Sequence, residues 1–200
     1  MKLYYSINSP YARKCRVLVL EKGLQDRVEF TDRMPLDEPI PDDLLAANPL
    51  ARVPALELDD GSAMTESNVI CAYLDSLGEP RLIPTDERAR IAMLRFVALT
   101  DGILDAAVHC VMEGRRPEEK RWPAWVKRKE DSIVRTLAAL EQQIIPAQPV
   151  TMATIALGVT LAYVEFRLGH LEWRKHQPFL AAWADSYNNR PTMLQTQPRK

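Results

Sequence analysis

Ser9 and Pro10 are the first residues whose types and position could support chemistry. They follow a short apolar run and precede a segment, residues 10–22, that is dense in Arg and Lys. Serine is favoured at the N-cap of a helix and proline at the first helical position, so the pair predicts a helix start. The amino end of a helix holds unpaired N–H groups and about half a positive charge, and it therefore binds anions. Helix initiation alone also explains the pair, so a role for Ser9 depends on other motifs.

Val53 and Pro54, in the stretch NPLARVPAL at residues 48–56, form the second motif. Pro54 opens a predicted strand, where a residue without an N–H group is tolerated. The sequence leaves the isomer of the Val53–Pro54 bond open. A cis bond would turn the neighbouring N–H and C=O groups toward a bound peptide.

Glu66 and Ser67, in the stretch TESNVICAYL at residues 65–74, form the third motif. Ser67 can cap the predicted helix that follows, and the free N–H groups beside it can bind a carboxylate. Glu66 could meet an ammonium group at the same place. The pair therefore suits the α-amino and α-carboxylate groups of an amino acid, although a plain helix start with an acidic first turn explains it equally well.

The elements that must position these motifs fall into two groups. The first 78 residues predict strands at 2–6, 27–32, 54–58 and 63–65 and helices at 10–22, 42–47 and 67–77. Residues 79–86 form a linker rich in turn formers, and the region 87–200 shows no convincing strand. Its predicted helices cover residues 87–113, 125–145, 151–168 and 178–187. The third of these is apolar nearly all round, as expected of the central helix in a small bundle, and Thr151 is its predicted cap.

Composition argues against several classes of function. Twenty-six basic and 27 acidic side chains give a formal charge of −1, which does not favour nucleic acid or an anionic membrane surface. The basic run at 115–129 is interrupted by Glu118 and Glu119, as in a solvated helix start. The longest apolar stretch, 155–164, is about half of a membrane span. Three cysteines and three histidines lack metal-ligand spacing, so we expect reduced thiols, no metal and a cytoplasmic protein without a signal peptide.

The three motifs in this order resemble those of the glutathione S-transferase family. S-P-Y-A-R-K follows the first strand, V-P precedes the third strand and E-S begins the third helix, with T-x-x-T at Thr151–Thr154 in the second half. The likeness extends over nearly the whole chain, and the opening looks most like bacterial members of the serine-type branch. It implies an α/β thioredoxin-like N-terminal domain at 1–78 and an all-α C-terminal helical bundle domain at 87–200.

The resemblance also implies how glutathione binds. Ser9 matches the residue whose hydroxyl donates to the glutathione thiolate, and Val53, before an expected cis Pro54, matches the backbone that pairs with the cysteinyl unit. Glu66 and Ser67 match the γ-glutamyl anchor. Arg52 could meet the glycyl carboxylate, with a solvated surface arginine as the alternative.

A second substrate is expected to face Ser9 between the two domains. The candidate lining residues are Tyr11, His109, Met112 and Arg116. His109 has the alternative of a partly buried structural histidine. The resemblance implies a homodimer, in which Asp101 or Asp105 could reach the γ-glutamyl ammonium bound by the neighbouring copy.

These features predict a glutathione transferase, in which a bound thiolate attacks a small electrophile while Ser9 stays neutral. Relatives that form mixed disulfides carry cysteine at the position of Ser9, and serine cannot form that bond. A glutathione-dependent peroxidase or reductase remains an alternative, as does a non-catalytic interaction protein with the same fold. Two further departures from the family pattern are Ala51, where many relatives have glycine, and Thr154, where many have aspartate.

Overall fold

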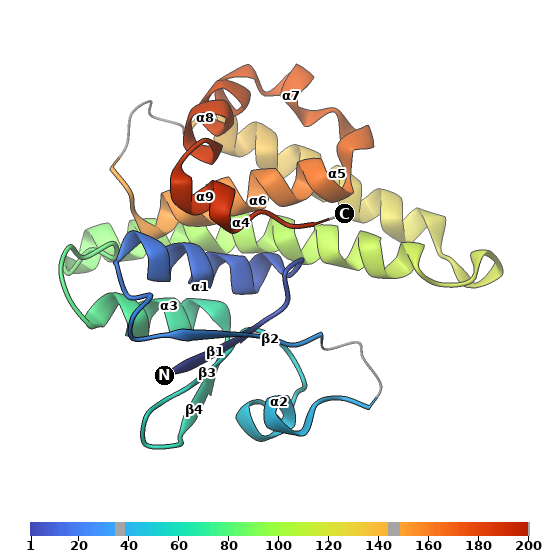
Figure 1. Cartoon of the computed structure of the whole chain (residues 1–200). Coiled ribbons are helices and arrows are strands. Elements are labelled where there is room, and N and C mark those ends of the chain that lie inside the picture. The colour runs from blue at the N-terminus through green and yellow to red at the C-terminus, as the bar shows by residue number, and fades with distance from the viewer. Residues whose placement is uncertain (35–38, 144–148, 200) are drawn as a thin grey trace.

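The first part of the chain folds into a four-stranded sheet, at the bottom of Figure 1. A computed structural model describes residues 1–34, 39–143 and 149–199. The strands are β1 (Lys2–Tyr5), β2 (Glu29–Asp32), β3 (Ala55–Glu57) and β4 (Ala63–Thr65). Their order is β2-β1-β3-β4, with β1 parallel to β2 and antiparallel to β3, and with β3 antiparallel to β4.

Three helices cover this sheet. α1 (Pro10–Glu21) and α3 (Ser67–Ser76) lie on one face and α2 (Asp42–Ala47) lies on the other (Figure 1). Successive side chains of a strand point to opposite faces, so Leu3 packs in the cluster with α1 and α3, whereas Tyr4 packs with Leu44 of α2. Gly23, with φ of 64°, follows the last turn of α1, as the sequence predicts. The predicted order of strand, helix, strand, hairpin and helix is confirmed.

All the secondary structure in the described residues of the second part is helical. Its helices are α4 (Glu87–Gly114), α5 (Pro123–Glu141), α6 (Met152–Arg167), α7 (Trp173–His176), α8 (Pro178–Asn188) and α9 (Pro191–Gln195), with 3-10 turns at Glu118–Lys120 and Gly169–Leu171. α6 is central and almost entirely buried, because it packs against α4, α8 and α1. The architecture is a thioredoxin-like domain followed by an all-α domain, which confirms the predicted fold class.

The start of α6 shows the capping box that the sequence indicates. The Thr151 Oγ accepts the N–H of Thr154 at 3.2 Å, and the Thr154 Oγ accepts the N–H of Thr151 at 2.9 Å. Threonine therefore completes this box in place of the more usual aspartate.

Some predicted boundaries are wrong. α5 ends at Glu141 and begins at Pro123, whereas the sequence predicts residues 125–145, of which 144 and 145 lie outside the described residues. The short helices α7 and α9 were not predicted, because neither is long enough to show a periodic apolar pattern.

The linker is held against the first domain by the buried carboxylate of Asp75. Asp75 accepts the N–H groups of Leu82 at 2.7 Å and Ile83 at 3.2 Å, and it pairs with Lys22 and Arg81. One buried cluster runs from α1 and α3 into α4 and α6, so the two parts of the chain share a core. This shared core holds α1 in a fixed position beneath α6.

No single helix among the described residues is both long and apolar enough to cross a membrane. α6 together with the bent segment 169–176 meets the length and composition criteria, but nearly all of α6 is buried within the protein.

Candidate functional site

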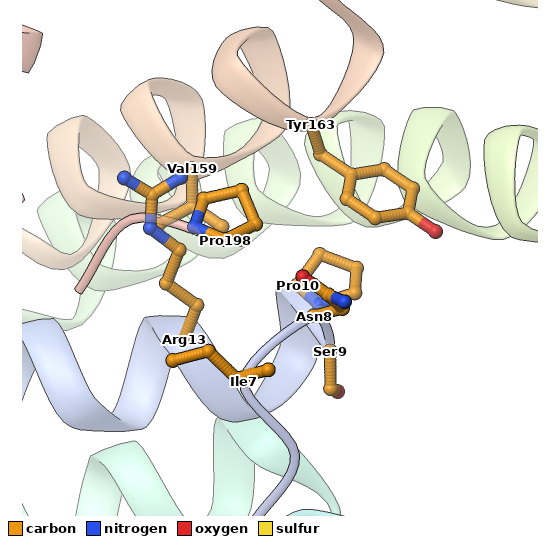
Figure 2. Close-up of a pocket in the computed structure, with 8 residues that line it drawn as sticks. All are labelled: Ile7, Asn8, Ser9, Pro10, Arg13, Val159, Tyr163 and Pro198. Carbon is orange, nitrogen blue, oxygen red and sulfur yellow. The ribbon is translucent and has the colours of Figure 1, made fainter. Parts of the chain in front are cut away.

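The start of α1 presents Ser9 at the edge of a pocket. Ser9 is the N-cap, and its Oγ accepts the N–H of Ala12 at 3.3 Å. The hydroxyl proton has no acceptor among the described residues, so it is available to a ligand. Figure 2 shows the pocket walls around Ser9, which come from the loop before α1, from α1, from α6 and from the carboxy-terminal tail. The residues are Ile7, Asn8, Pro10, Arg13, Val159, Tyr163 and Pro198. The predicted cap and helix start are confirmed.

The start of α3 differs from the prediction, because Glu66 and not Ser67 is the N-cap. One Glu66 carboxylate oxygen accepts the N–H groups of Asn68 at 3.0 Å and Val69 at 3.2 Å. Ser67 is the first helical residue, is buried, and donates its hydroxyl to the other Glu66 oxygen at 3.2 Å. Glu66 has φ of 73°, a left-handed conformation that is costly for a residue with a side chain. That conformation turns the carboxylate over the end of the helix, where a charged acceptor outcompetes the serine hydroxyl.

The loop before β3 is shaped by Asn48, which the sequence analysis missed. The Val53–Pro54 bond is cis. The buried Asn48 side chain donates to the C=O of Arg52 at 2.7 Å and accepts the N–H of Leu50 at 3.0 Å. Val53 precedes the paired residues of β3, and its N–H and C=O have no backbone partner in the described part of the chain. Its backbone is therefore available for pairing with an extended ligand.

Ala51, in the same loop, has φ of 51°. This left-handed conformation favours glycine, which accounts for the glycine that many relatives have at this position.

A buried polar network joins the three helices around the site. The Lys14 Nζ, fully buried on α1, lies 2.5 Å from Asp101 of α4 and 3.2 Å from the Asn68 Oδ1 of α3. Asn68 in turn donates to the second Asp101 oxygen at 2.7 Å. The network fixes the amino end of α3 relative to α1. Both carboxylate oxygens of Asp101 therefore accept hydrogen bonds from residues of the same chain.

Tyr11 follows Ser9 by two residues and donates its hydroxyl to Asp105 of α4. Burial and this hydrogen bond raise the pKa of Tyr11 above its usual value, so the phenol stays neutral. Its proton is engaged by Asp105, which leaves Ser9 as the hydroxyl donor at the start of α1. Asp105, like Asp101, thus has a partner within the chain.

The other predicted pocket residues lie in the second half of α4 or just after its end. His109 and Met112 are exposed, and the exposed Arg116 pairs with Glu113 at 3.2 Å. None of the three lines the pocket of Figure 2. Their part in a second-substrate site stays a prediction.

Tyr163 and the carboxy-terminal tail complete the pocket and were missed by the sequence analysis. Tyr163 belongs to a segment whose apolar character indicated only a core helix. The tail is fixed by Asn8, whose Oδ1 accepts the N–H of Arg199 at 2.9 Å, and by the buried Arg13, which donates to the Met193 C=O at 3.0 Å. Because these residues are distant along the chain, no local sequence pattern predicts their contacts.

Cysteine and metal chemistry have little support within the described residues. The Cys15 thiol is buried 3.7 Å from the Cys71 sulfur, and burial followed by this neighbour raises the pKa of Cys15 well above its usual value. No group of three or more His, Cys, Asp or Glu in the described ranges could hold a metal ion.

Comparison with known proteins places this geometry in a family. Residues 8–77 match the family model described as glutathione S-transferase, N-terminal domain. The chain is 30% identical over 205 residues to an uncharacterized GST-like protein, YibF, of Escherichia coli K12, with 100% of both chains covered.

Two solved structures of a glutathione transferase family member from Pseudomonas fluorescens Pf-5 are also similar. One, with bound glutathione, has a TM-score of 0.93 and 40% identity and covers 100% of this chain and 99% of that chain. The other, with bound S-(propanoic acid)-glutathione, has a TM-score of 0.91 and 39% identity over 100% of both chains. Full-length similarity, the shared fold and the three motifs together show that the chain belongs to the glutathione S-transferase family.

Proposed function

We propose that this protein is a glutathione transferase that activates the thiol of bound glutathione for attack on a small electrophile. The observation that carries the proposal is the Ser9 hydroxyl, whose proton has no acceptor among the described residues and which lies at the amino end of α1. An anion placed there would receive both a hydrogen bond and the favourable field of the helix.

The hydrogen bond and the helix end together can stabilise the thiolate enough to activate the thiol. A thiol with a pKa near 8.5 is mostly protonated at neutral pH, and its thiolate is the nucleophile. Lowering that pKa by about two units takes about 2.7 kcal/mol of selective stabilisation of the thiolate. A hydrogen bond to a charged group supplies about 1.5–3 kcal/mol and a helix amino end up to about 1–2 kcal/mol. The sulfur electron pair then forms the new bond to carbon, and the leaving group departs with the electron pair of the broken bond.

The rest of the tripeptide has complementary groups nearby. Glu66 offers a carboxylate to the γ-glutamyl ammonium, and the N–H of Ser67, which has no partner in the described part of the chain, is available to its carboxylate. The unpaired backbone of Val53 suits the cysteinyl unit, and the exposed Arg52 suits the glycyl carboxylate. The bound glutathione in the similar Pseudomonas fluorescens structure supports glutathione as the ligand.

The proposal includes a homodimer in the cytoplasm. Val69 of α3 and Ile91 and Leu94 of α4 are apolar and 52%, 47% and 39% exposed, which suits burial against a second copy. Adjacent free thiols at Cys15 and Cys71 suit a reducing compartment.

The test combines glutathione binding with two activities. Isothermal titration calorimetry of the wild type should show glutathione binding, and Ser9→Ala should lose at least about tenfold in kcat/KM toward 1-chloro-2,4-dinitrobenzene. Ser76→Ala, at the far end of α3, is the matched control. Activity confined to cumene hydroperoxide would instead support the peroxidase alternative. Absence of heat at millimolar glutathione would overturn the proposal in favour of an interaction protein.

A further inference from the structure

We propose that the cavity between α6, α8 and the carboxy-terminal tail is a second ligand site. It binds a small zwitterion, whose carboxylate contacts Arg13 and whose amino group contacts Asp185 and Asn188. Free amino acids and dipeptides have this chemistry. The inference does not rest on the proposed function, because glutathione takes no part in it.

The cavity is large enough for such a molecule and is distinct from the Ser9 pocket. Its volume is about 350 Å³, which lies within the range of ordinary small-molecule sites. Its walls come from α1, α6, α7, α8, α9 and the residues after α9, whose arrangement Figure 1 shows. Arg13 and Pro198 line both cavities, so they form a wall that the two sites share.

Arg13 is a buried cation without an acidic partner in the described part of the chain. It is 4% exposed, its Nε donates to the Thr196 Oγ1 at 3.3 Å, and its Nη2 donates to the Met193 C=O at 3.0 Å. These bonds use two of the five N–H groups of a guanidinium, and the other three have no acceptor among the described residues. In Figure 2 the guanidinium extends toward Val159 and Pro198, away from Ser9.

The burial of Arg13 is costly, and a carboxylate would offset that cost. Burial, and then the positive charge of Arg16, lower the pKa of Arg13 to about 10, so the guanidinium stays charged at neutral pH. A desolvated charge without a counter-ion is unfavourable. A ligand carboxylate would supply the counter-ion and accept the free N–H groups.

The other charged residues of the cavity carry an excess of negative charge. Glu165 of α6 and Asp185 of α8 both pair with Arg174, each at 2.8 Å, so two carboxylates share one positive charge. One turn after Asp185, the Oδ1 of Asn188 is buried and has no donor among the described residues. A ligand ammonium group would supply both the missing charge and an N–H donor.

The balance of charges and the apolar lining favour an amino acid over a simple anion or cation. Arg13 and Arg174 offset Glu165 and Asp185, so a ligand with one charge would be repelled by part of the wall, whereas a zwitterion would not. The remaining lining includes apolar side chains, namely Ala162, Phe166, Ala184 and Leu194. An aliphatic group on the ligand would cover Leu194, which is 48% exposed.

Calorimetric titration of L-leucine and L-alanyl-L-leucine tests the inference without any catalytic step. The more tightly bound of the two shows the length of the ligand. Its N-acetyl form lacks the ammonium group and its C-terminal amide lacks the carboxylate. Each of these should bind at least about tenfold more weakly than the free form. Equal affinity for the free form and either blocked form would overturn the inference.

Variants locate the two contacts. Arg13→Gln should remove the preference for the free carboxylate over the amide, and Arg13→Lys should recover part of it. Asp185→Asn should reduce the preference for the free amine over the acetyl form. Because Arg13 also anchors the tail, Ala162→Phe provides an independent test: it fills the cavity, leaves every charged residue in place and should weaken binding at least about tenfold. Ala138→Phe, at an exposed position of α5, is the matched control and should bind as the wild type does.

The start of α3 is the other place where an amino acid could bind. Glu66→Gln should weaken glutathione binding but leave binding of the zwitterion unchanged. Loss of zwitterion binding in Glu66→Gln, or wild-type affinity in the folded Ala162→Phe variant, would overturn the inference while the proposed function stands. If the zwitterion binds and glutathione does not, the proposed function fails and this inference stands.

Discussion

The Nζ of Lys14, fully buried on α1, lies 2.5 Å from the Asp101 carboxylate of α4. Asn68 of α3 bonds to both groups, so one ion pair sets the relative positions of the helix that begins at Ser9 and the helix that begins after Glu66. Each of the two helices begins at its right-hand end in Figure 1, beneath the middle part of α4. The two parts of the candidate glutathione site are therefore joined by a buried charge pair.

Replacing Lys14 by Met should lower the free energy of unfolding by about 3 kcal/mol, because it leaves Asp101 without its counter-ion in a largely buried place. The glutathione Kd should rise as the amino end of α3 loses its support. Urea unfolding and calorimetry measure the two effects. Lys127→Met, which removes the exposed pair with Asp131, should cost less than about 1 kcal/mol; equal losses in both variants would contradict the role of the network.

Ser9→Ala should raise the thiol pKa of bound glutathione by about one to two units, because the thiolate loses one charge-assisted hydrogen bond. The thiolate absorbance near 240 nm, followed as a function of pH in the complex, reports this directly. The same change removes the helix cap and should lower the free energy of unfolding by about 1 kcal/mol. An unchanged thiol pKa in a variant that still binds glutathione would exclude Ser9 from thiol activation.

Ala51→Gly should raise the free energy of unfolding by about 0.5–1 kcal/mol. The φ of 51° strains a residue with a Cβ, and relief of that strain exceeds the added flexibility of glycine in the unfolded chain. Ala98→Gly, at an exposed helical position in α4, should instead lower the free energy of unfolding by about 1 kcal/mol. Chemical denaturation of both variants measures the two changes. A destabilised Ala51→Gly would mean that the loop does not hold this backbone conformation.

Gly158→Ala should be destabilising by about 1–3 kcal/mol, although alanine is the better helix former. A Cβ at position 158 of α6 would lie 2.6 Å from the Tyr187 ring and 3.3 Å from Met193. Gly102→Ala in α4, where a Cβ meets nothing within 4 Å, should instead gain up to about 1 kcal/mol. Thermal unfolding should show a lower Tm than the wild type for Gly158→Ala and a higher Tm for Gly102→Ala.

The contribution of Asp75 to stability should depend on pH. Burial raises the pKa of Asp75, but hydrogen bonds from the Leu82 N–H, Arg81 and Lys22 outweigh it, and the net pKa is lowered. The stabilisation is therefore fully present above the unfolded pKa of about 3.9 and is lost as pH falls through the folded value. Asp75→Asn should lower the free energy of unfolding by about 3 kcal/mol at pH 7 and by much less at pH 2. A difference between wild type and variant that does not change over this range would contradict the assignment.

The sequence by itself determined the fold class, the order of the elements and the three motifs around the site. These features have local causes. Ser9 with Pro10 begins a helix, Gly23 ends it, and Thr151 with Thr154 forms a capping box, each within a few residues.

Only the tertiary structure decided which residues complete the site. Glu66 replaces Ser67 as the cap because the fold imposes a left-handed backbone at residue 66, which no local pattern specifies. Tyr163 lies at the start of α1, although it is more than 150 residues further along the chain, because α6 packs against α1. The physical reason is that caps and turns are satisfied by groups a few bonds away, whereas the walls of a pocket between two domains depend on how distant surfaces pack.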